Sequence, residues 1–130
     1  SDTSYKSILY YGKNMTVFGS IHKDIVDRLI ENAEKMDCEC ITLEEYFNRN
    51  SISKVDFLKV DCESSEYKIF RTMPDDILNC IRKLFVEYHI PPVGEIWSVR
   101  DILNKLEDAG FKYAFKPNAT KDLGSFYAWK

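Results

Sequence analysis

The sequence predicts an α/β domain with a mostly parallel sheet and an antiparallel C-terminal edge. Strand-like and helix-like segments alternate through most of the chain, which is the order that a parallel sheet requires. Two strand-like segments then follow one another near the C-terminus, and such a succession indicates an antiparallel pair. The length of 130 residues is typical of one domain, so we expect a single α/β domain over residues 1–130.

In the N-terminal third, a long amphipathic helix is expected over residues 20–36. Apolar residues recur there at three- and four-residue spacing, and Ser20 is a suitable N-cap. The apolar positions are Ile21, Ile25, Leu29, Ala33 and Met36. Before this helix, residues 8–11 favour a short strand that ends at Gly12.

A strand over residues 38–42 and a short helix over residues 43–48 are expected next. Thr42 and Glu45 have the spacing of a capping box, in which the hydroxyl and the carboxylate each accept a hydrogen bond from a free backbone amide. This pattern predicts that the helix begins directly after Thr42.

The middle of the chain predicts two strands joined by helices. The segments 55–61 and 83–89 are rich in apolar residues, and two prolines stop the second of them. Helices are expected around residues 65–72 and 75–81, on either side of the helix breaker Pro74. This strand–helix–strand order is typical of two parallel neighbours in a sheet.

The C-terminal part predicts one helix and two strands. Ser98 begins a helix with an apolar stripe, and Gly110 is a suitable residue for its C-terminal end. Residues 111–115 and 125–129 are rich in aromatic side chains and are expected to form strands on either side of a polar loop.

Composition restricts the classes of function. The net charge of −3 leaves no broad basic surface, so we expect no nucleic-acid and no membrane partner. The chain has no apolar run of the ~18–20 residues that cross a membrane, and its first residues show no apolar signal-peptide region, so a cytoplasmic location is expected. The four cysteines are expected to be reduced and mostly buried, with a zinc site at Cys38 and Cys40 as the alternative.

Charged residues inside the two central strands point to a site. If the strands are parallel neighbours and their fifth residues align, polar side chains pair on one face of the sheet. The carboxyl ends of such strands are where open α/β sheets bind ligands. This register places Phe57 beside Phe85, Lys59 beside Glu87, and Asp61 beside His89.

The segment after the first of these strands is dense in carboxylates. Asp61, Glu63 and Glu66 lie within six residues and are able to hold a divalent cation or accept a proton. The alternative is that Glu66 complements a helix N-terminus while the other two are solvated, and no metal site is assigned. His89 is a candidate site residue or a neutral structural histidine, and His22 is expected at the surface.

Three segments resemble the FkbM family of S-adenosylmethionine-dependent methyltransferases. The family pattern has T-L-D, then D-x-x-K-x-D-x-E-G-x-E, then a strand that ends in E-x-H, and the resemblance covers residues 41–129. The matching segments here are Ile41–Phe47, Val55–Tyr67 and Leu84–His89. The core of the match is formed by Lys59, Asp61, Glu63 and Glu66.

The resemblance implies a Rossmann-like fold with a seven-stranded sheet. It makes 55–61 and 83–89 the fourth and fifth strands, and the last two strands the antiparallel edge. It also implies transfer of a methyl group from S-adenosylmethionine to a hydroxyl of a sugar or small natural product. Asp61, Glu63 and His89 would be the catalytic residues, with Lys59, Glu66 and Glu87 supporting them.

The chain departs from the family pattern in two respects. Ser64 and Ser65 replace the family's Gly-Ala, and serine tolerates a positive φ less well than glycine. No G-x-G turn occurs that would hold the methyl donor, so no cofactor-binding residue is assigned. We therefore expect an incomplete, C-terminal portion of the fold that is inactive alone and has an exposed sheet edge that favours a homodimer.

Three functions remain open from the sequence. The first is an O-methyltransferase that acts on a small-molecule hydroxyl acceptor. The second is a degenerate α/β interaction module that has lost the cofactor loop and catalysis. The third is a small metal-binding or phosphoacceptor domain that uses Lys59, Asp61 and Glu63.

Overall fold

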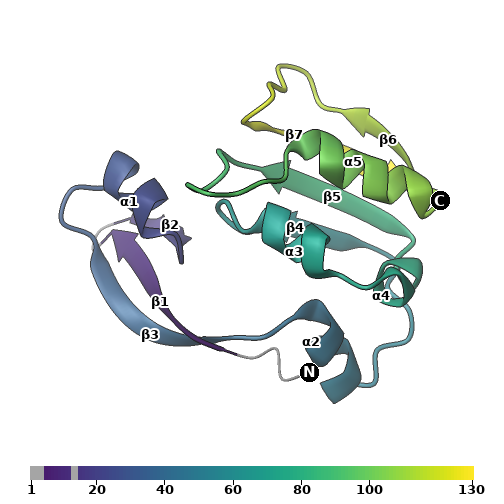
Figure 1. Cartoon of the computed structure of the whole chain (residues 1–130), viewed down its shortest axis with the longest axis horizontal. Coiled ribbons are helices and arrows are strands. Elements are labelled where there is room, and N and C mark those ends of the chain that lie inside the picture. The colour runs from purple at the N-terminus through teal and green to yellow at the C-terminus, as the bar shows by residue number, and fades with distance from the viewer. Residues whose placement is uncertain (1–4, 13–14) are drawn as a thin grey trace.

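The N-terminal third of the protein forms a small antiparallel sheet. A computed structural model describes residues 5–12 and 15–130. Strand β1 (Tyr5–Gly12) lies between β2 (Met15–Ser20) and β3 (Glu34–Cys40), and it pairs antiparallel with both. This sheet and the short helix α1 (Lys23–Leu29) lie to the left in Figure 1, apart from the remaining strands.

The prediction of a long helix over residues 20–36 is wrong. Helix α1 ends at Leu29, whose side chain is exposed, and Met36 is an exposed residue of β3. Between the two elements Asn32 adopts a φ of 56°, which turns the chain. Residues 34–40 pair with Tyr5–Tyr11 of β1, and this long-range pairing overrides the helical spacing of the apolar residues.

The second sheet has the strand order β4-β5-β7-β6. Its strands are β4 (Leu58–Asp61), β5 (Lys83–Tyr88), β6 (Lys112–Phe115) and β7 (Gly124–Trp129). The antiparallel C-terminal edge is confirmed, because β7 runs antiparallel to both β5 and β6.

The expectation of a mostly parallel sheet is wrong. Among the described strands only β4 and β5 form a parallel ladder, and the seven strands lie in two sheets of three and four rather than in one. The physical reason lies in how successive strands are connected and where β7 inserts. Two helical crossovers join strands that run in the same direction, β4 to β5 and β5 to β6, but β7 inserts antiparallel between β5 and β6. Strands β1 to β3 pair among themselves.

The prediction that β4 and β5 are parallel neighbours is confirmed, but the expected register between them is wrong by two residues. Lys59 pairs with Phe85, and Asp61 pairs with Glu87. The ladder is already set by a bridge between Val55 and Ile81, so the second segment enters it two residues earlier than assumed. A shift of two residues keeps every side chain on its expected face, because side chains alternate with a period of two.

Four helices complete the fold. Helix α2 (Leu43–Arg49) begins after Thr42, whose Oγ1 accepts a hydrogen bond from Glu45 N at 3.1 Å, as the capping pattern predicts. Helices α3 (Glu66–Thr72) and α5 (Val99–Asp108) lie side by side over one face of the second sheet, with α4 (Asp75–Asn79) at its end (Figure 1). The buried core lies between this layer and the sheet and includes Tyr67, Phe70, Leu84, Leu106 and Phe126.

The cysteines are free thiols, as expected, but they are not mostly buried. Cys38, Cys40 and Cys80 are half-buried, and Cys62 is exposed. Burial raises the pKa of the Cys38 thiol, with a further contribution from Cys40. Burial also raises the pKa of the Cys62 thiol, so the raised pKa values favour the protonated form of Cys38 and Cys62 near neutral pH.

Gly124 begins β7 at a point where the backbone approaches another segment closely. A Cβ at this position would lie 2.6 Å from the hydroxyl oxygen of Tyr88 and 2.9 Å from Ala119 Cα. We expect Gly124→Ala to lower the free energy of unfolding by about 1–3 kcal/mol, measured by urea denaturation. Adding Ala119→Gly should restore part of the loss, because it removes one clashing methyl group, and an unchanged midpoint in Gly124→Ala would contradict this account.

Candidate active site

The acidic segment and His89 meet at the carboxyl ends of β4 and β5. Asp61 ends β4 and pairs with Glu87 of β5, while His89 follows β5 by one residue. The loop from 62 to 65 carries Glu63 and leads into α3. The two strands therefore bring together side chains that are 28 residues apart in the sequence, as the sequence predicted for Asp61 and His89.

The imidazole of His89 lies at the centre of four carboxylates. Its Nε2 is 3.6 Å from Glu63 Oε2, 3.9 Å from Asp61 Oδ1 and 4.0 Å from Glu87 Oε1. Its Nδ1 is 3.1 Å from Glu66 Oε1. The hydrogen bond to Glu66 is the main reason why the pKa of His89 is raised, and desolvation opposes it in part.

Glu66 is fully buried at the start of α3. Its Oε1 accepts a hydrogen bond from Cys62 N at 2.7 Å and also faces His89, while its Oε2 has no hydrogen-bond partner among the described residues. Complementing the helix N-terminus does not account for this arrangement, because the carboxylate also holds a histidine ring. Asp61 and Glu63 remain partly exposed, with 30% and 23% of their side-chain surface accessible.

The expected ion pair between Lys59 and Glu87 is wrong. Lys59 Nζ lies 2.8 Å from Asp61 Oδ2, and its side chain is exposed rather than buried. The cause is the register, which places Lys59 beside Phe85. The hydrogen bond with Asp61 raises the pKa of Lys59, so the ammonium stays charged at the edge of the site.

The loop that carries Glu63 is held in an unusual backbone conformation. Glu63 and Ser64 have φ values of 45° and 81°, in the region that favours glycine. Ser20 Oγ donates a hydrogen bond to Glu63 O at 2.7 Å, which ties the loop to the end of β2. Burial raises the pKa of Glu63, and the charge of His89 opposes this shift.

Ser64 stands where the family pattern has glycine, and the loop geometry favours a return to glycine. Its hydroxyl is buried with no hydrogen-bond partner among the described residues. We expect Ser64→Gly to raise the free energy of unfolding by about 1 kcal/mol, measured by urea denaturation, because it relieves backbone strain and an unpaired polar group. Ser65, with a φ of −87°, is the matched control, and Ser65→Gly should destabilise the protein. Equal effects of both substitutions would contradict the assignment of strain to Ser64.

His22 was expected at the surface, but it lies against the acidic loop. Its Nε2 is 3.0 Å from Ser65 Oγ, and its backbone N donates to Ser20 Oγ at 3.1 Å. Sequence reasoning missed both Ser20 and His22, because their partners lie 43 residues away. The only local signal was their place at the expected helix start.

Desolvation lowers the pKa of His22, and this gives a pH-dependent effect on stability. The unfolded chain binds a proton near pH 6.5 while the folded protein resists it, so His22 destabilises the fold as the pH falls through that value. We expect the stability of wild type relative to His22→Gln to fall between pH 7.5 and pH 5.5, measured by urea denaturation at each pH. The other titrating groups are the same in both proteins, so their contributions cancel in the difference between the two free energies of unfolding. A difference that stays constant over this pH range would contradict the prediction.

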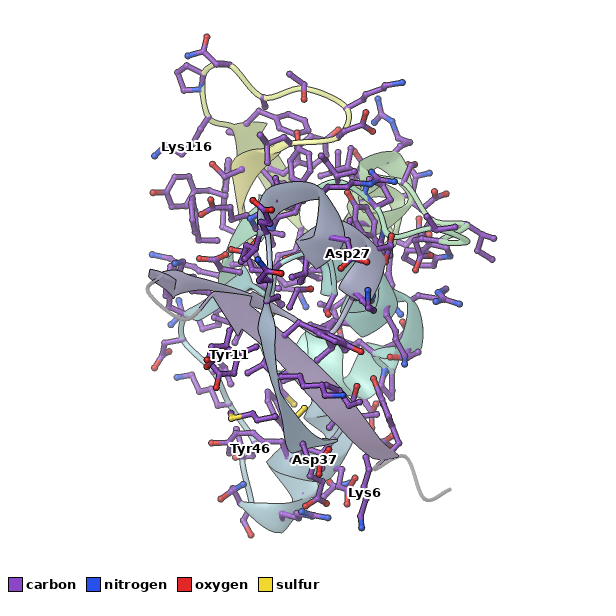
Figure 2. All side chains as sticks on the ribbon, turned by 90° about the vertical axis from the view of Figure 1, so that its left-hand side faces the viewer. Lys6, Tyr11, Asp27, Asp37, Tyr46 and Lys116 are labelled. Atoms are coloured by element: carbon purple, nitrogen blue, oxygen red, sulfur yellow. The ribbon has the colours of Figure 1, made fainter. Side chains whose placement is uncertain are left out.

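A cavity of about 540 Å³ adjoins the acidic loop. It lies between the β1–β3 sheet on one side and α2 and α3 on the other, and Asp61 and Glu63 are part of its lining. Figure 2 looks onto the β1–β3 side of the molecule and labels Tyr11 and Asp37, which belong to that sheet, and Tyr46, which belongs to α2. The volume falls within the range of small-molecule sites.

The described residues fit one part of a sulfonium methyl donor and not the other. Carboxylates beside apolar walls favour a sulfonium cation, and Asp61 and Glu63 supply them. A glycine-rich turn between a parallel strand and a helix, which would hold the nucleoside, does not occur in residues 5–12 or 15–130, since β1 leads into an antiparallel hairpin.

Comparison with known proteins gives one finding about family. A family profile described as "Methyltransferase FkbM domain" matches residues 4–113. No curated protein and no solved structure matches the chain.

Within the described part of the chain, none of the helices has the length and apolar character needed to cross a membrane.

Proposed function

The chain belongs to the FkbM methyltransferase family, and from this premise we propose that it acts in O-methyl transfer from S-adenosylmethionine to a hydroxyl of a sugar or small natural product. The observation that carries the proposal is the cluster of Asp61, Glu63 and His89 at the carboxyl ends of two parallel strands. The cavity beside the cluster supplies space for a small molecule.

The side chains of the cluster have distinct roles in this proposal. When bound, the donor would supply an electrophilic methyl group: the acceptor oxygen would form a bond to this carbon as the methyl–sulfur bond breaks, the neutral thioether S-adenosylhomocysteine would leave, and the hydroxyl would lose its proton. Glu63 accepts that proton, because its carboxylate lies at the cavity and is partly exposed. Asp61 and His89 position the hydroxyl by hydrogen bonds, and buried Glu66 fixes the orientation of the His89 ring.

One observation favours a second candidate, the non-catalytic interaction module. The described strands before β4 are antiparallel and offer no glycine-rich turn for the donor. In that case the acidic cluster would be a remnant of catalysis, and the chain would bind neither the donor nor its demethylated product.

Calorimetry with S-adenosylmethionine and with S-adenosylhomocysteine separates the two candidates. Saturable binding, followed by transfer of a labelled methyl group to a panel of hydroxylated sugars and natural products, supports the enzyme. Absence of binding at millimolar concentration supports the interaction module. The surface variant Glu107→Gln, in the exposed part of α5, is the control and should bind as wild type does.

A further inference from the structure

We propose that Asp61, Glu87 and His89 form a binding site for a divalent transition-metal cation of the Mn²⁺ type. The sequence left a divalent cation at Asp61, Glu63 and Glu66 as an open alternative. Glu87 was not part of that set, because its register was expected to pair it with Lys59. Binding of the cation stands independently of methyl transfer, whereas its role in holding the acceptor hydroxyl rests on the proposed function.

The three side chains converge on one point. A ligand atom from each lies within 4.8 Å of the other two. His89 Nε2 is 3.9 Å from Asp61 Oδ1 and 4.0 Å from Glu87 Oε1. Bonds of about 2.1 Å to a metal separate neighbouring ligands by roughly 3.0–3.4 Å, so side-chain shifts of less than about 1 Å would complete the set. All three side chains are accessible to a cation from solvent, at 30%, 44% and 16% exposure.

Glu66 provides a second, independent observation. It is a carboxylate with no exposed surface, placed behind the imidazole, and its Oε2 is unpartnered among the described residues. Its Oε1, 3.1 Å from His89 Nδ1, favours the tautomer that carries the proton on Nδ1. Nε2 is then the nitrogen with a free lone pair, and Glu63, Asp61 and Glu87 lie 3.6, 3.9 and 4.0 Å from it. A buried carboxylate behind a histidine is the usual support for a metal-bound imidazole.

The charge balance of the cluster also favours a cation. Four carboxylates, from Asp61, Glu63, Glu66 and Glu87, surround a single imidazole. Lys59 contacts this group through Asp61 and remains exposed at its edge. A divalent cation would offset the excess negative charge at the centre, where Lys59 does not reach. The imidazole nitrogen favours Mn²⁺ or a similar transition metal over Mg²⁺, which prefers oxygen ligands alone.

A cation at this position has a direct use in the proposed reaction. Coordination of the acceptor oxygen lowers the pKa of the hydroxyl, so the proton leaves more readily to Glu63. Glu63 Oε2 lies 3.6 Å from His89 Nε2, close enough to receive a proton from an oxygen bound at the cation. With the cation bound, Asp61 and His89 would position the acceptor hydroxyl through the cation in place of direct hydrogen bonds. Glu87 would complete the ligand set, and Glu63 would remain the base.

The test uses Mn²⁺ alone, without donor or acceptor. We expect chelator-treated protein to bind about one Mn²⁺ per chain, measured by the loss of the free Mn²⁺ signal in electron paramagnetic resonance, with a rise in melting temperature. Glu87→Gln and His89→Gln should each weaken binding at least ~10-fold. Glu107→Gln should bind as wild type does. Circular dichroism of each variant shows that it is folded, and Glu87, which is partly exposed, is the position where folding is least affected by the change.

Two results would overturn the site: no saturable binding at millimolar Mn²⁺, or equal binding by wild type and folded Glu87→Gln. Failure of the proposed function gives a different result, because Mn²⁺ would bind and the Glu87→Gln loss would persist while no methyl group is transferred. Methyl transfer that continues unchanged in chelator would overturn the cation's role in the reaction and leave the methyltransferase assignment standing.

Discussion

Glu63→Gln is expected to lower the rate of methyl transfer by roughly 10²–10⁴-fold, the usual contribution of a general base. The amide keeps the size of the side chain and loses the ability to accept a proton. The measurement is kcat and KM for transfer of a labelled methyl group to the best acceptor of the panel. We expect the loss in kcat, with KM changed little, because Asp61 and His89, which position the acceptor hydroxyl, are unchanged in this variant.

The same variant distinguishes the base from the cation ligands. Glu63→Gln should bind Mn²⁺ within a few-fold of wild type, whereas Glu87→Gln should not. Glu107→Gln serves as the control for a lost surface charge and should keep full activity. A Glu63→Gln protein with wild-type kcat would remove Glu63 from the reaction and shift the role of base to Asp61 or His89.

Glu66→Ala is expected to lower the free energy of unfolding by about 2–4 kcal/mol, because it leaves two donors without their acceptor in a buried place. Cys62 N and His89 Nδ1 both lose the oxygen that holds them. The measurement is urea denaturation at pH 7 with chelator present. Glu66→Gln retains one oxygen at this position and should be affected less than Glu66→Ala.

The Glu66→Ala substitution should weaken Mn²⁺ binding as well as lower the free energy of unfolding. Without Glu66 the ring of His89 is free to rotate, so Mn²⁺ binding by Glu66→Ala should weaken even where the protein is folded. Glu107→Ala is the control for truncation of an exposed helical glutamate. If Glu66→Ala unfolded at the same urea concentration as wild type, the buried carboxylate would have no structural role.

Local sequence patterns predicted the second sheet better than the first. The strands β4 and β5 and the hairpin of β6 and β7 follow from apolar runs that end at prolines or polar loops. The first sheet was not predicted, because Ile25, Leu29 and Met36 have helical spacing although Met36 belongs to a strand. The pairing of β1 with β3 depends on residues far apart in sequence, and periodicity carries no information about it.

The sequence predicted which residues form the candidate site and on which face of the sheet they lie. It did not predict which of their side chains pair. Asp61 and His89 lie together as expected, since both end parallel neighbours. The partner of Lys59 could not be predicted, because it depends on the register of a ladder that a bridge at Val55 sets earlier in the chain. The burial of Glu66 could not be predicted either, because it depends on contacts between the start of α3 and the distant His89. The error of two residues in the register changed the cross-strand neighbour of every residue in β4 and β5. Each side chain nevertheless stayed on its expected face of the sheet.

The hydrogen bonds from Ser20 and His22 cross between two sheets that share no strand ladder among the described residues. Glu63 therefore depends on both halves of the molecule for its position. A ligand or partner that displaced β2 would release the Glu63 loop without disturbing the core beneath β5. Local opening of the smaller sheet, which lies outside the main core, would loosen Glu63 alone, because Asp61, Glu87 and His89 are held by β4 and β5.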